Sequence, residues 1–502
     1  MSVGAPPRPF AERVGRGLLA NQIGRGVEYA ATYAASVVAA RAFGALGYGT
    51  WSVALSVVTL SATATALGLN EILNTQVPRM AALPGRIAFL LRRLLRLRAG
   101  VALAVAASLY LLAPALARTW RNPDLAPAIQ AGALYGFFAQ VSLLLEYFLI
   151  GRLEVPQAAV IRVAVQLLHL GAAALALRLH LPPRLLFLAM AGNGALGLAA
   201  LLWRARATLA SPAEAFDLAP MMRFGLALWL TSFVNFFVGR QADILFIGLF
   251  RPGTDQPGAY SAASLLALLL AGALLMGAEG VSLAAFSEVE ERVDRAGLGR
   301  LWALHVKMDV LLSVPLLVFG GCFAREIVTV LYGAGFERAG GLLAAYAAVW
   351  VVARALGGGT NMAVLYAMQS PRLPLVIYAA CGAWNLIGDL LLVPRLGAAG
   401  AVIATGVAMV GAGLASGIVI RRRTGALAPL GFVLRVMAAA ALGTVLALRM
   451  PRPPGLLGLI VAAVVAGVVS IIGLRLLKPF DAEDRRLLAR LAPRLGWLFA
   501  WL

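Results

Sequence analysis

Charged residues are scarce in this sequence. Asp, Glu, Lys and Arg make up 13% of the 502 residues, and hydrophobic residues make up 61%. A soluble protein carries about 25% charged residues, so this composition excludes a soluble globular protein. The net charge of +21 lies mainly at the ends of apolar segments, which is the pattern of membrane orientation rather than of nucleic-acid binding. We therefore expect membrane lipids as neighbours and no nucleic-acid partner.

Cysteine and histidine are almost absent. Cys322 and Cys381 offer neither a disulfide framework nor a metal pattern, and His169, His180 and His305 are not spaced as a ligand set. No G-x-x-x-x-G-K-[ST] motif occurs, which argues against the phosphate-binding loop of ATP-driven transporters. We therefore predict no cofactor, no metal and no catalytic residue.

Long polar segments are missing as well. Apolar blocks of about 20 residues, enough to cross a bilayer as a helix, follow one another along the chain. The predicted fold is an all-α integral membrane protein with about fourteen transmembrane helices. The predicted spans are 17–43, 48–70, 99–117, 127–150, 157–178, 182–203, 223–250, 258–286, 303–323, 341–368, 372–393, 397–420, 429–449 and 455–477.

Arginine and lysine set the orientation. The N-terminal segment "MSVGAPPRPFAERVGRG" has no apolar core followed by a cleavage site, and the basic loops, including residues 421–423, share its side. Because basic loops stay in the cytosol and the number of spans is even, both termini are predicted to be cytosolic. Two basic amphipathic segments, residues 85–98 ("GRIAFLLRRLLRLR") and the tail 479–502, are expected on the inner leaflet with their arginines at lipid phosphates.

The two halves of the sequence resemble each other. "GTWSVALS" from Gly49 is similar to "GAYSAASL" from Gly258, and the same offset matches further small residues as far as Gly68 and Gly277. Repeat-built membrane folds commonly place a substrate site between their halves, near the midplane. The predicted divisions are a cytosolic segment 1–16, an N-lobe 17–212, a C-lobe 213–425, two additional helices 426–478 and an amphipathic cytosolic tail 479–502.

Polar residues lie inside several predicted spans, and the first span of each half contains an Asn, then an Arg, then an acid three residues after the Arg. A charge at the bilayer centre costs about 2.5–3.5 kcal/mol on insertion scales, and such residues usually face a bundle interior or a watery path. In the first span the polar residues are Asn21, Arg25, Glu28, Thr32 and Ser36. In the seventh span, taken as one continuous helix, Ser232, Asn235, Gly239, Arg240 and Asp243 fall on one side.

Other predicted helices carry polar stripes too. An Arg and an acid can neutralise each other inside a helix bundle, and this structural interpretation stays open. The recurrence of the stripes in both halves favours a substrate or ion path. The stripes are Ser142 with Glu146, Arg162 with Gln166 and His169, Glu279 with Ser282, and Arg354 with Gly358 and Asn361, while Asp309 and Asp389 lie nearer span ends.

The functional interpretation assigns two roles to these residues. A cavity lined with arginines suits an anionic head group such as a pyrophosphate, and buried acids can bind a proton or Na⁺. Asp243 is expected to pair with Arg240 when no substrate is bound. The predicted substrate-binding residues are Asn21, Arg25, Arg162, Asn235, Arg240, Arg354 and Asn361. The predicted ion-coupling residues are Glu28, Glu146, Asp243 and Glu279.

Three segments resemble a known family. They are "RAFGALGYGTWSVALS", "RQADILFIGLF" with "GAYSAASL", and "NLIGDLLLVPRLGAAGAVIAT" at 385–405. They resemble the lipid-linked oligosaccharide flippases of Wzx type, which are polysaccharide biosynthesis and transport proteins of the multidrug/oligosaccharidyl-lipid/polysaccharide (MOP) exporter superfamily. Arg25 and Arg240 fall where related flippases carry cavity-lining cations, and Asp243 falls where the family often carries an acid.

The resemblance implies a MATE-like fold, with two pseudo-symmetric six-helix lobes plus two C-terminal helices, that works by alternating access. It implies a monomer in the bacterial inner membrane. The implied substrate is a polyprenyl-pyrophosphate-linked oligosaccharide, an O-antigen or exopolysaccharide repeat unit, whose translocation is coupled to H⁺ or Na⁺. Polysaccharide polymerase and glycosyltransferase machinery are the implied partners.

Two alternatives within the superfamily stay open. One is a lipid II flippase, which also moves a polyprenyl-linked sugar. The other is a MATE-type multidrug or cation antiporter, which would favour an acidic and aromatic cavity, whereas the embedded stripes of this chain carry as many arginines as acids. A membrane glycosyltransferase or polymerase would need a sizeable external loop, and every predicted external loop is short, so we do not expect an enzyme.

Overall fold

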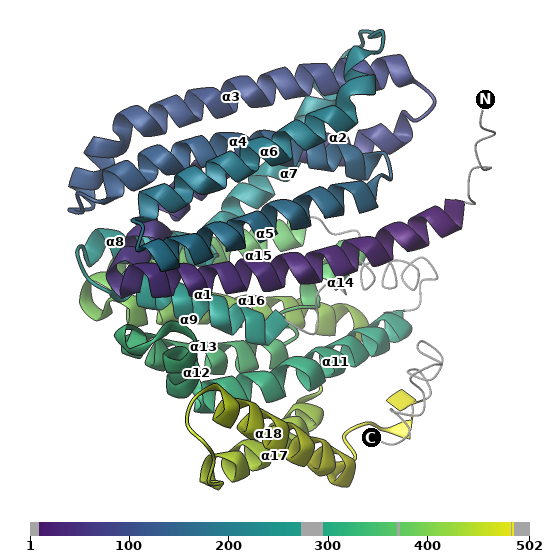
Figure 1. Ribbon diagram of the computed structural model, residues 1–502. Coiled ribbons are helices and arrows are strands. Elements are labelled where there is room, and N and C mark those ends of the chain that lie inside the picture. The colour runs from purple at the N-terminus through teal and green to yellow at the C-terminus, as the bar shows by residue number, and fades with distance from the viewer. Residues whose placement is uncertain (1–9, 273–294, 369–371, 483, 486–502) are drawn as a thin grey trace, which may run out of the picture. The chain divides into compact units, whose positions relative to one another are not determined.

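The computed structural model describes residues 10–272, 295–368, 372–482 and 484–485, and every regular element in them is a helix (Figure 1). The chain divides into two compact units, Met1–Gly258 and Ala259–Leu502. Each unit is an α-helical bundle with its own packing. The five divisions predicted from the sequence, with a lobe boundary at residue 212, stay a prediction.

The N-terminal unit contains eight helices within the described residues. They pack along their lengths, and α1 contacts α4, α5, α6 and α8. The helices are α1 (Phe10–Ala64), α2 (Leu69–Arg79), α3 (Pro84–Thr119), α4 (Leu125–Gly151), α5 (Val155–Leu179), α6 (Pro183–Ala210), α7 (Ala219–Phe236) and α8 (Arg240–Phe250).

Helix α1 is two helices joined at Gly44, whose φ of 64° and ψ of 177° lie outside the helical region. Only glycine adopts this conformation without steric cost, so the kink falls where "AFGALG" separates the first two predicted spans. The second half ends at Ala64, earlier than the predicted residue 70. Leu67 and Gly68 have φ of 54° and 67°, and this left-handed turn leads into the short helix α2.

The basic segment 85–98 is not a separate helix on the membrane surface, which corrects the prediction. It forms the first turns of the 36-residue helix α3. Its apolar residues Ile87, Leu91 and Leu94 are buried in a core that includes Leu73 of α2 and Leu145 of α4. The apolar face of the segment therefore packs on protein.

The predicted span 223–250 is broken, which also corrects the prediction. Helix α7 ends at Phe236 and α8 begins at Arg240, with a bend of 48° between them. Gly239, in an extended conformation, is the residue that precedes α8. Ser232 and Asn235 thus lie on α7 and do not share one helix face with Arg240 and Asp243.

The C-terminal unit begins within the first turn of α9 (Gln256–Gly272). The predicted span 341–368 is split, because α13 ends at Ala355 and the turn that contains Gly357 (φ 77°) leads into α14. The further helices are α11 (Arg295–Cys322), α12 (Ala324–Tyr332), η1 (Ala334–Phe336), α13 (Glu337–Ala355), α14 (Asn361–Ala367), α15 (Arg372–Leu396), α16 (Ala398–Thr424), α17 (Leu430–Arg449) and α18 (Leu456–Leu477).

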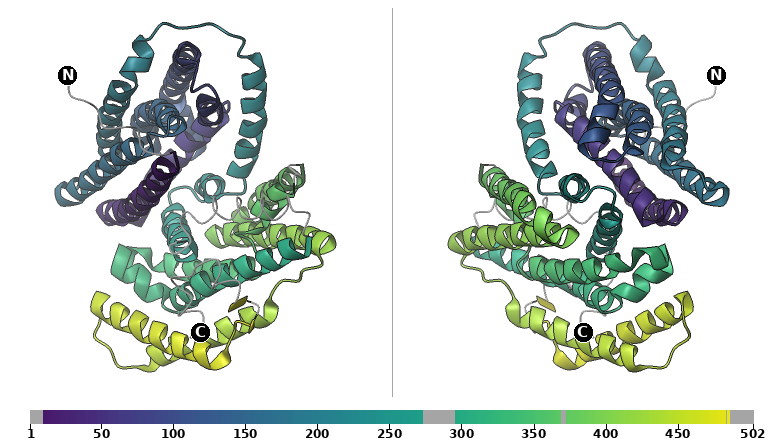
Figure 2. Two further views of the ribbon diagram at one scale, coloured as in Figure 1. Left: turned by 90° about the vertical axis from the view of Figure 1, so that its right-hand side faces the viewer. Right: turned by 90° about the vertical axis from the view of Figure 1, so that its left-hand side faces the viewer.

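The last two helices, α17 and α18, lie side by side in both views of Figure 2. A Cβ on Gly443 would lie 2.4 Å from the carbonyl oxygen of Ala466, so the glycine allows close backbone approach. The pair docks on the rest of the C-terminal unit at Phe323, which clusters with Ala447 and Ala462. Most of the predicted tail 479–502 lies outside the described residues.

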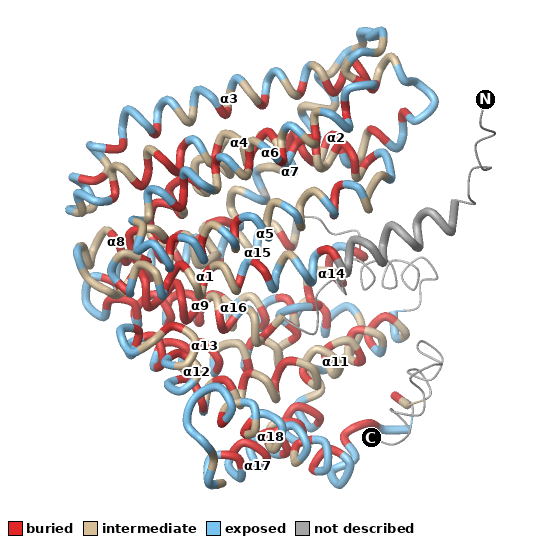
Figure 3. Tube along the Cα trace, in the orientation of Figure 1, coloured by how far each residue is buried: buried red, intermediate tan, exposed pale blue. Residues whose placement is uncertain are grey.

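Eleven helices of the described residues are long and apolar enough to cross a membrane, or up to twelve if α7 and α8 count as one bent span. The 41-residue candidate Gly24–Ala64 holds two predicted spans, one on each side of Gly44, and the predicted span 258–286 continues beyond the described residues. Figure 3 shows exposed outer faces on α3 and α18, where residues such as Leu111 and Leu476 are 76% exposed. Exposed apolar surface of this extent suits lipid, and the all-α membrane fold is confirmed.

Candidate functional site

An arginine and two acids meet inside the N-terminal unit. Arg162 of α5 lies 2.8 Å from Glu28 of α1 through its Nε atom, and its Nη1 atom donates a hydrogen bond to Glu146 of α4. The Arg162 and Glu146 side chains are only 13% and 14% exposed. Three predicted site residues from three helices thus form one cluster, which we call the Arg162 cluster.

The Arg162 cluster carries a surplus negative charge when both acids are ionised, because one guanidinium faces two carboxylates. Arg25, one turn before Glu28, is exposed and lies within electrostatic range of Glu146. Arg25 forms no ion pair with any residue that the structure describes. Its predicted role in substrate binding stays a prediction.

The remaining polar residues of the first span make local contacts. Thr32 donates a hydrogen bond to the backbone oxygen of Glu28 (2.8 Å), and the Ser36 hydroxyl lies 2.5 Å from the Tyr48 hydroxyl in a buried pair. The side chain of Asn21 lies outside the described side chains. Its assignment stays a prediction.

Arg240 is the first residue of α8, directly after the break. Its Nη1 atom is buried and donates no hydrogen bond to any described residue. Tyr33 of α1 lies within electrostatic range of the guanidinium. The first N–H groups of a helix have no intrahelical acceptor and carry partial positive charge, so the start of α8 combines a helix N-terminus with an unsatisfied guanidinium N–H.

Asp243 is fully buried in the first turn of α8. The expected pairing with Arg240 is absent, since Arg240 forms no ion pair among the described residues, and this corrects the prediction. The neighbouring Gln241 accepts a hydrogen bond from Ser56 of α1 at 2.5 Å. Asn235, near the end of α7, is exposed, and its predicted role in substrate binding stays a prediction.

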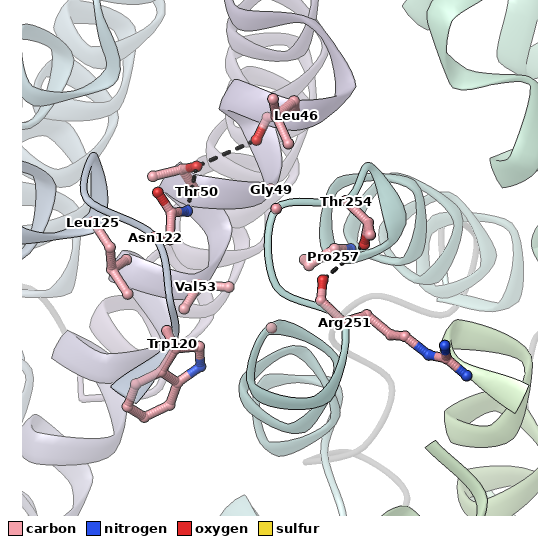
Figure 4. A pocket seen from close by; sticks show the side chains of 12 residues that line it. Leu46, Gly49, Thr50, Val53, Trp120, Asn122, Leu125, Arg251, Thr254 and Pro257 are labelled. Carbon is pink, nitrogen blue, oxygen red and sulfur yellow. Dashed lines mark hydrogen bonds between the residues drawn. The ribbon is translucent and has the colours of Figure 1, made fainter. Parts of the chain in front are cut away.

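A small pocket lies near the other end of α8, between α1 and the loop that follows α3 (Figure 4). The Asn122 amide donates to the Thr50 hydroxyl (3.0 Å), which donates to the Leu46 carbonyl oxygen (3.3 Å). In Figure 4 the Arg251 guanidinium points away from the pocket. The polar groups of the wall thus bind one another, and the pocket contains none of the predicted site residues.

The C-terminal unit has an internal arginine of its own. Arg354 of α13 lies 3.3 Å from Asp309 of α11 and donates a hydrogen bond to the carbonyl oxygen of Ala271 (3.1 Å). Thr360 also donates to Asp309, at 3.1 Å. The Arg354 side chain is 11% exposed. Asp309, expected near a span end, therefore joins Arg354 in bracing the break between α13 and α14.

Asn361 forms hydrogen bonds with protein groups on several sides. Its amide oxygen accepts a hydrogen bond from Trp302 (2.8 Å), and its amide nitrogen donates to Ser416 (2.7 Å) and to the carbonyl oxygen of Leu356 (2.9 Å). The side chain is 1% exposed. Protein groups use its hydrogen-bonding capacity, and its substrate role stays a prediction.

Glu279 lies outside the described residues, so its predicted role in ion coupling stays a prediction. In the part of the chain that the structure describes, no three His, Cys, Asp or Glu residues are grouped so as to hold a metal ion. Asp389 is fully buried on α15.

One buried arginine was missed by sequence analysis. Arg98 of α3 is 2% exposed, although it belongs to the basic segment that was assigned to lipid phosphates. A signal was present, because Leu91, Leu94 and Arg98 are three and four residues apart and so lie on one face of a helix. That face is apolar, which predicts burial of Arg98.

Comparison with known protein families shows the family to which the chain belongs. A family model described as "Polysaccharide biosynthesis protein" matches residues 38–339. The chain belongs to the polysaccharide biosynthesis protein family. The matched region contains Arg162, Arg240 and Asp243. No curated protein matches this member of the family at the level of sequence.

Solved structures share the fold of this polysaccharide biosynthesis family protein at low sequence identity. The lipid II flippase MurJ in an inward closed conformation has a TM-score of 0.68 and 12% identity, over 93% of this chain and 98% of that chain. An inward-facing MATE-family multidrug resistance transporter has a TM-score of 0.68 and 12% identity, over 80% and 94%. A MOP superfamily transporter from Pyrococcus furiosus has a TM-score of 0.58 and 12% identity, over 82% and 95%.

These similarities confirm the predicted MATE-like fold. The solved structures that share this fold are a flippase and a multidrug transporter. At 12% identity the likeness concerns the fold alone, and it does not transfer a substrate to this polysaccharide biosynthesis family protein.

Proposed function

We propose that this membrane transporter translocates a polyprenyl-pyrophosphate-linked oligosaccharide, an O-antigen or exopolysaccharide repeat unit, across the bacterial inner membrane by alternating access. Both termini lie in the cytosol in this proposal. The observation that supports it most directly is Arg240, whose buried Nη1 atom has no hydrogen-bond acceptor among the described residues. Membership of the polysaccharide biosynthesis family supplies the class of substrate.

The start of α8 suits a phosphate for two reasons. Broken transmembrane helices in transporters direct the positive ends of their half-helices at anionic substrate groups, and α8 begins directly after a break. A guanidinium adds charge-assisted hydrogen bonds to phosphate oxygens, and the free N–H of Arg240 requires such an acceptor. In the proposed mechanism Arg240 and the exposed Arg25 bind the pyrophosphate, and its neutralisation lowers the cost of moving it through the bilayer.

The Arg162 cluster supplies the proposed ion coupling. Two carboxylates on one guanidinium leave a surplus negative charge, which a proton or Na⁺ neutralises. An anionic head group that approaches Arg25 and Arg162 competes with Glu28 and Glu146 for the guanidinium groups. A released carboxylate then binds the coupling ion, so substrate binding and ion binding are linked through Arg162.

The test compares Arg240→Ala with Arg223→Ala, a change to an exposed arginine on the preceding helix α7. Each variant is expressed in a strain that lacks the gene, and polyprenyl-linked oligosaccharides are extracted and identified. We expect accumulation with Arg240→Ala at a normal membrane level of the protein, and clearance with Arg223→Ala. Clearance by Arg240→Ala would exclude the assigned role of Arg240. Accumulation of lipid II would indicate a lipid II flippase, and unchanged lipids with altered resistance to cationic drugs would indicate an antiporter.

A further inference from the structure

The second half of α1 ends at Ala64, inside the N-terminal unit. The last carbonyl groups of a helix have no N–H donors within the helix. The turn 65–68 follows, and Leu67 and Gly68 adopt left-handed conformations. Gly68 packs so closely on α7 that an added Cβ would lie 1.9 Å from the carbonyl oxygen of Gly225. The N–H of Leu69 donates to the Ala66 carbonyl oxygen (3.2 Å), but the carbonyl groups at this helix end can accept further donors or a cation.

The guanidinium of Arg98 supplies N–H donors and a positive charge at this helix end. Its Nη1 atom donates to the Thr65 carbonyl oxygen (3.2 Å) and to Oε1 of Gln140 (3.3 Å). Its Nη2 atom donates to the Ala66 carbonyl oxygen (3.1 Å) and to Oδ1 of Asn70 (3.5 Å). The guanidinium therefore lies among two backbone carbonyl oxygens and two amide oxygens, which we call the oxygen cradle.

All four oxygens of the cradle are neutral. Arg98 forms no ion pair among the described residues, and Glu71 is the acid within electrostatic range. Gln140 and Asn70 are themselves only 7% and 8% exposed, so the cradle is shielded from bulk solvent. The negative end of the helix dipole of α1 is the main balancing charge.

A cradle of this kind has the chemistry of a monovalent-cation site. In transporters, the C-terminal ends of half-helices and unwound backbone carbonyls coordinate Na⁺. The break after α1 offers the same combination of helix end and carbonyl oxygens, with two side-chain amide oxygens added. The indole N–H of Trp229 donates to the neighbouring Thr63 carbonyl oxygen at 2.8 Å, so α7 also holds this helix end.

We propose that the oxygen cradle is a monovalent-cation site whose occupant is built into the chain, with the guanidinium of Arg98 in the place of a diffusible ion. The bound guanidinium clamps the junction of α1 and α2. The N-terminal unit consequently needs no Na⁺ at this position. This proposal is independent of the proposed function, since it concerns how the helix break is stabilised and not what is transported.

The test measures the melting temperature of the full-length protein in detergent at constant ionic strength. Arg98→Ala vacates the cradle, and Arg93→Ala, an exposed position on the same helix, is the matched control. We expect Arg98→Ala to melt at a lower temperature in choline chloride and to recover part of the loss in low millimolar guanidinium, because a cation that binds only the folded state stabilises it. The wild type and Arg93→Ala should not respond. An Arg98→Ala protein that gains nothing from guanidinium or Na⁺ over choline would overturn the proposal.

A second pair of variants covers the case in which Arg98→Ala does not fold. Arg98→Lys keeps a cation in the cradle, whereas Arg98→Met fills a similar space without charge. We expect Arg98→Lys to melt nearer to the wild type than Arg98→Met does. The reverse order would show that the site requires volume rather than a cation, and the proposal would be wrong.

Discussion

Gly49 and Gly258, the two glycines that the internal repeat matches, pack directly against each other. A Cβ on Gly49 would lie 3.0 Å from the amide nitrogen of Gly258, and a Cβ on Gly258 would lie 2.0 Å from the carbonyl oxygen of Ala45. The absence of both side chains allows α1 to approach the start of α9 at backbone distance. Each copy of the repeat therefore has a glycine at this position because a side chain would prevent the close packing.

Gly258→Ala should therefore destabilise the protein. The new methyl group collides with a backbone oxygen that cannot rotate away, and overpacking of this kind costs about 1–3 kcal/mol. A thermal melt of the purified protein measures the effect. Gly272→Ala, in the same helix but with no atom of the described residues within 4 Å of its Cβ position, is the control and should leave the melting temperature nearly unchanged. Equal melting temperatures for the two variants would contradict the packing argument.

Removal of Arg162 should be more harmful than removal of the whole Arg162 cluster. Arg162→Met leaves Glu28 and Glu146 without their shared cation, and loss of one partner from a buried ion pair costs about 3–5 kcal/mol. The triple variant Arg162→Met, Glu28→Gln, Glu146→Gln removes the charges together and should regain much of the loss. The yield and melting temperature of the two proteins in detergent measure this. If the triple variant is no more stable than Arg162→Met, the acids are not held by Arg162.

An alanine at Gly359 should destabilise the break between α13 and α14. An added Cβ would lie 2.1 Å from Nη1 of Arg354 and 2.6 Å from Oδ2 of Asp309, so Gly359→Ala forces this ion pair apart. We expect a loss of about 1–3 kcal/mol in stability. A double-mutant cycle with Arg354→Met tests the cause, because the alanine should cost less once the guanidinium is gone. Additive effects of the two changes would place the strain elsewhere.

Phe480 and Asp484, which follow α18, should come away from the C-terminal unit when one ion pair is removed. Nζ of Lys307 lies 2.5 Å from Oδ2 of Asp484, which is 6% exposed, and the Phe480 ring packs on Phe432. Asp484→Asn removes the charge that Lys307 faces, and we expect trypsin to cleave after Arg485 several-fold faster. Asp124→Asn is the control, since Asp124 is exposed and lies in the N-terminal unit, whereas Lys307 lies in the C-terminal unit. Equal cleavage rates in the two variants would show that the ion pair does not hold this segment.

The class of the protein could be predicted from the sequence because the bilayer imposes strict rules. Long apolar runs with few charges can satisfy their backbone hydrogen bonds in lipid only as helices. These rules gave the correct spans for α4, α5, α6 and the last helices. They failed at α7 and α8, where the hydropathy of "VNFFVGRQADILFIGLF" is continuous and a local extended residue, Gly239, ends one helix and starts another.

The polar stripes also followed from the sequence, because helical spacing alone puts residues on one face. Their partners did not. Arg240 and Asp243, three residues apart, do not pair, whereas Arg162 pairs with Glu28 and Glu146 from two other helices. Spacing along one helix determines which face of the helix a side chain occupies. Only the packing of several helices determines which charged side chains lie close enough to form an ion pair.

By itself, then, the sequence determined a helical membrane protein with charges at defined positions on its helices, since periodicity and hydropathy are local properties. The tertiary structure alone decided which oxygens surround Arg98 and that Arg240 keeps an unsatisfied N–H. Both outcomes depend on where distant helix ends and breaks meet. Such meetings are set by the close packing of side chains from several helices, and no local pattern encodes them.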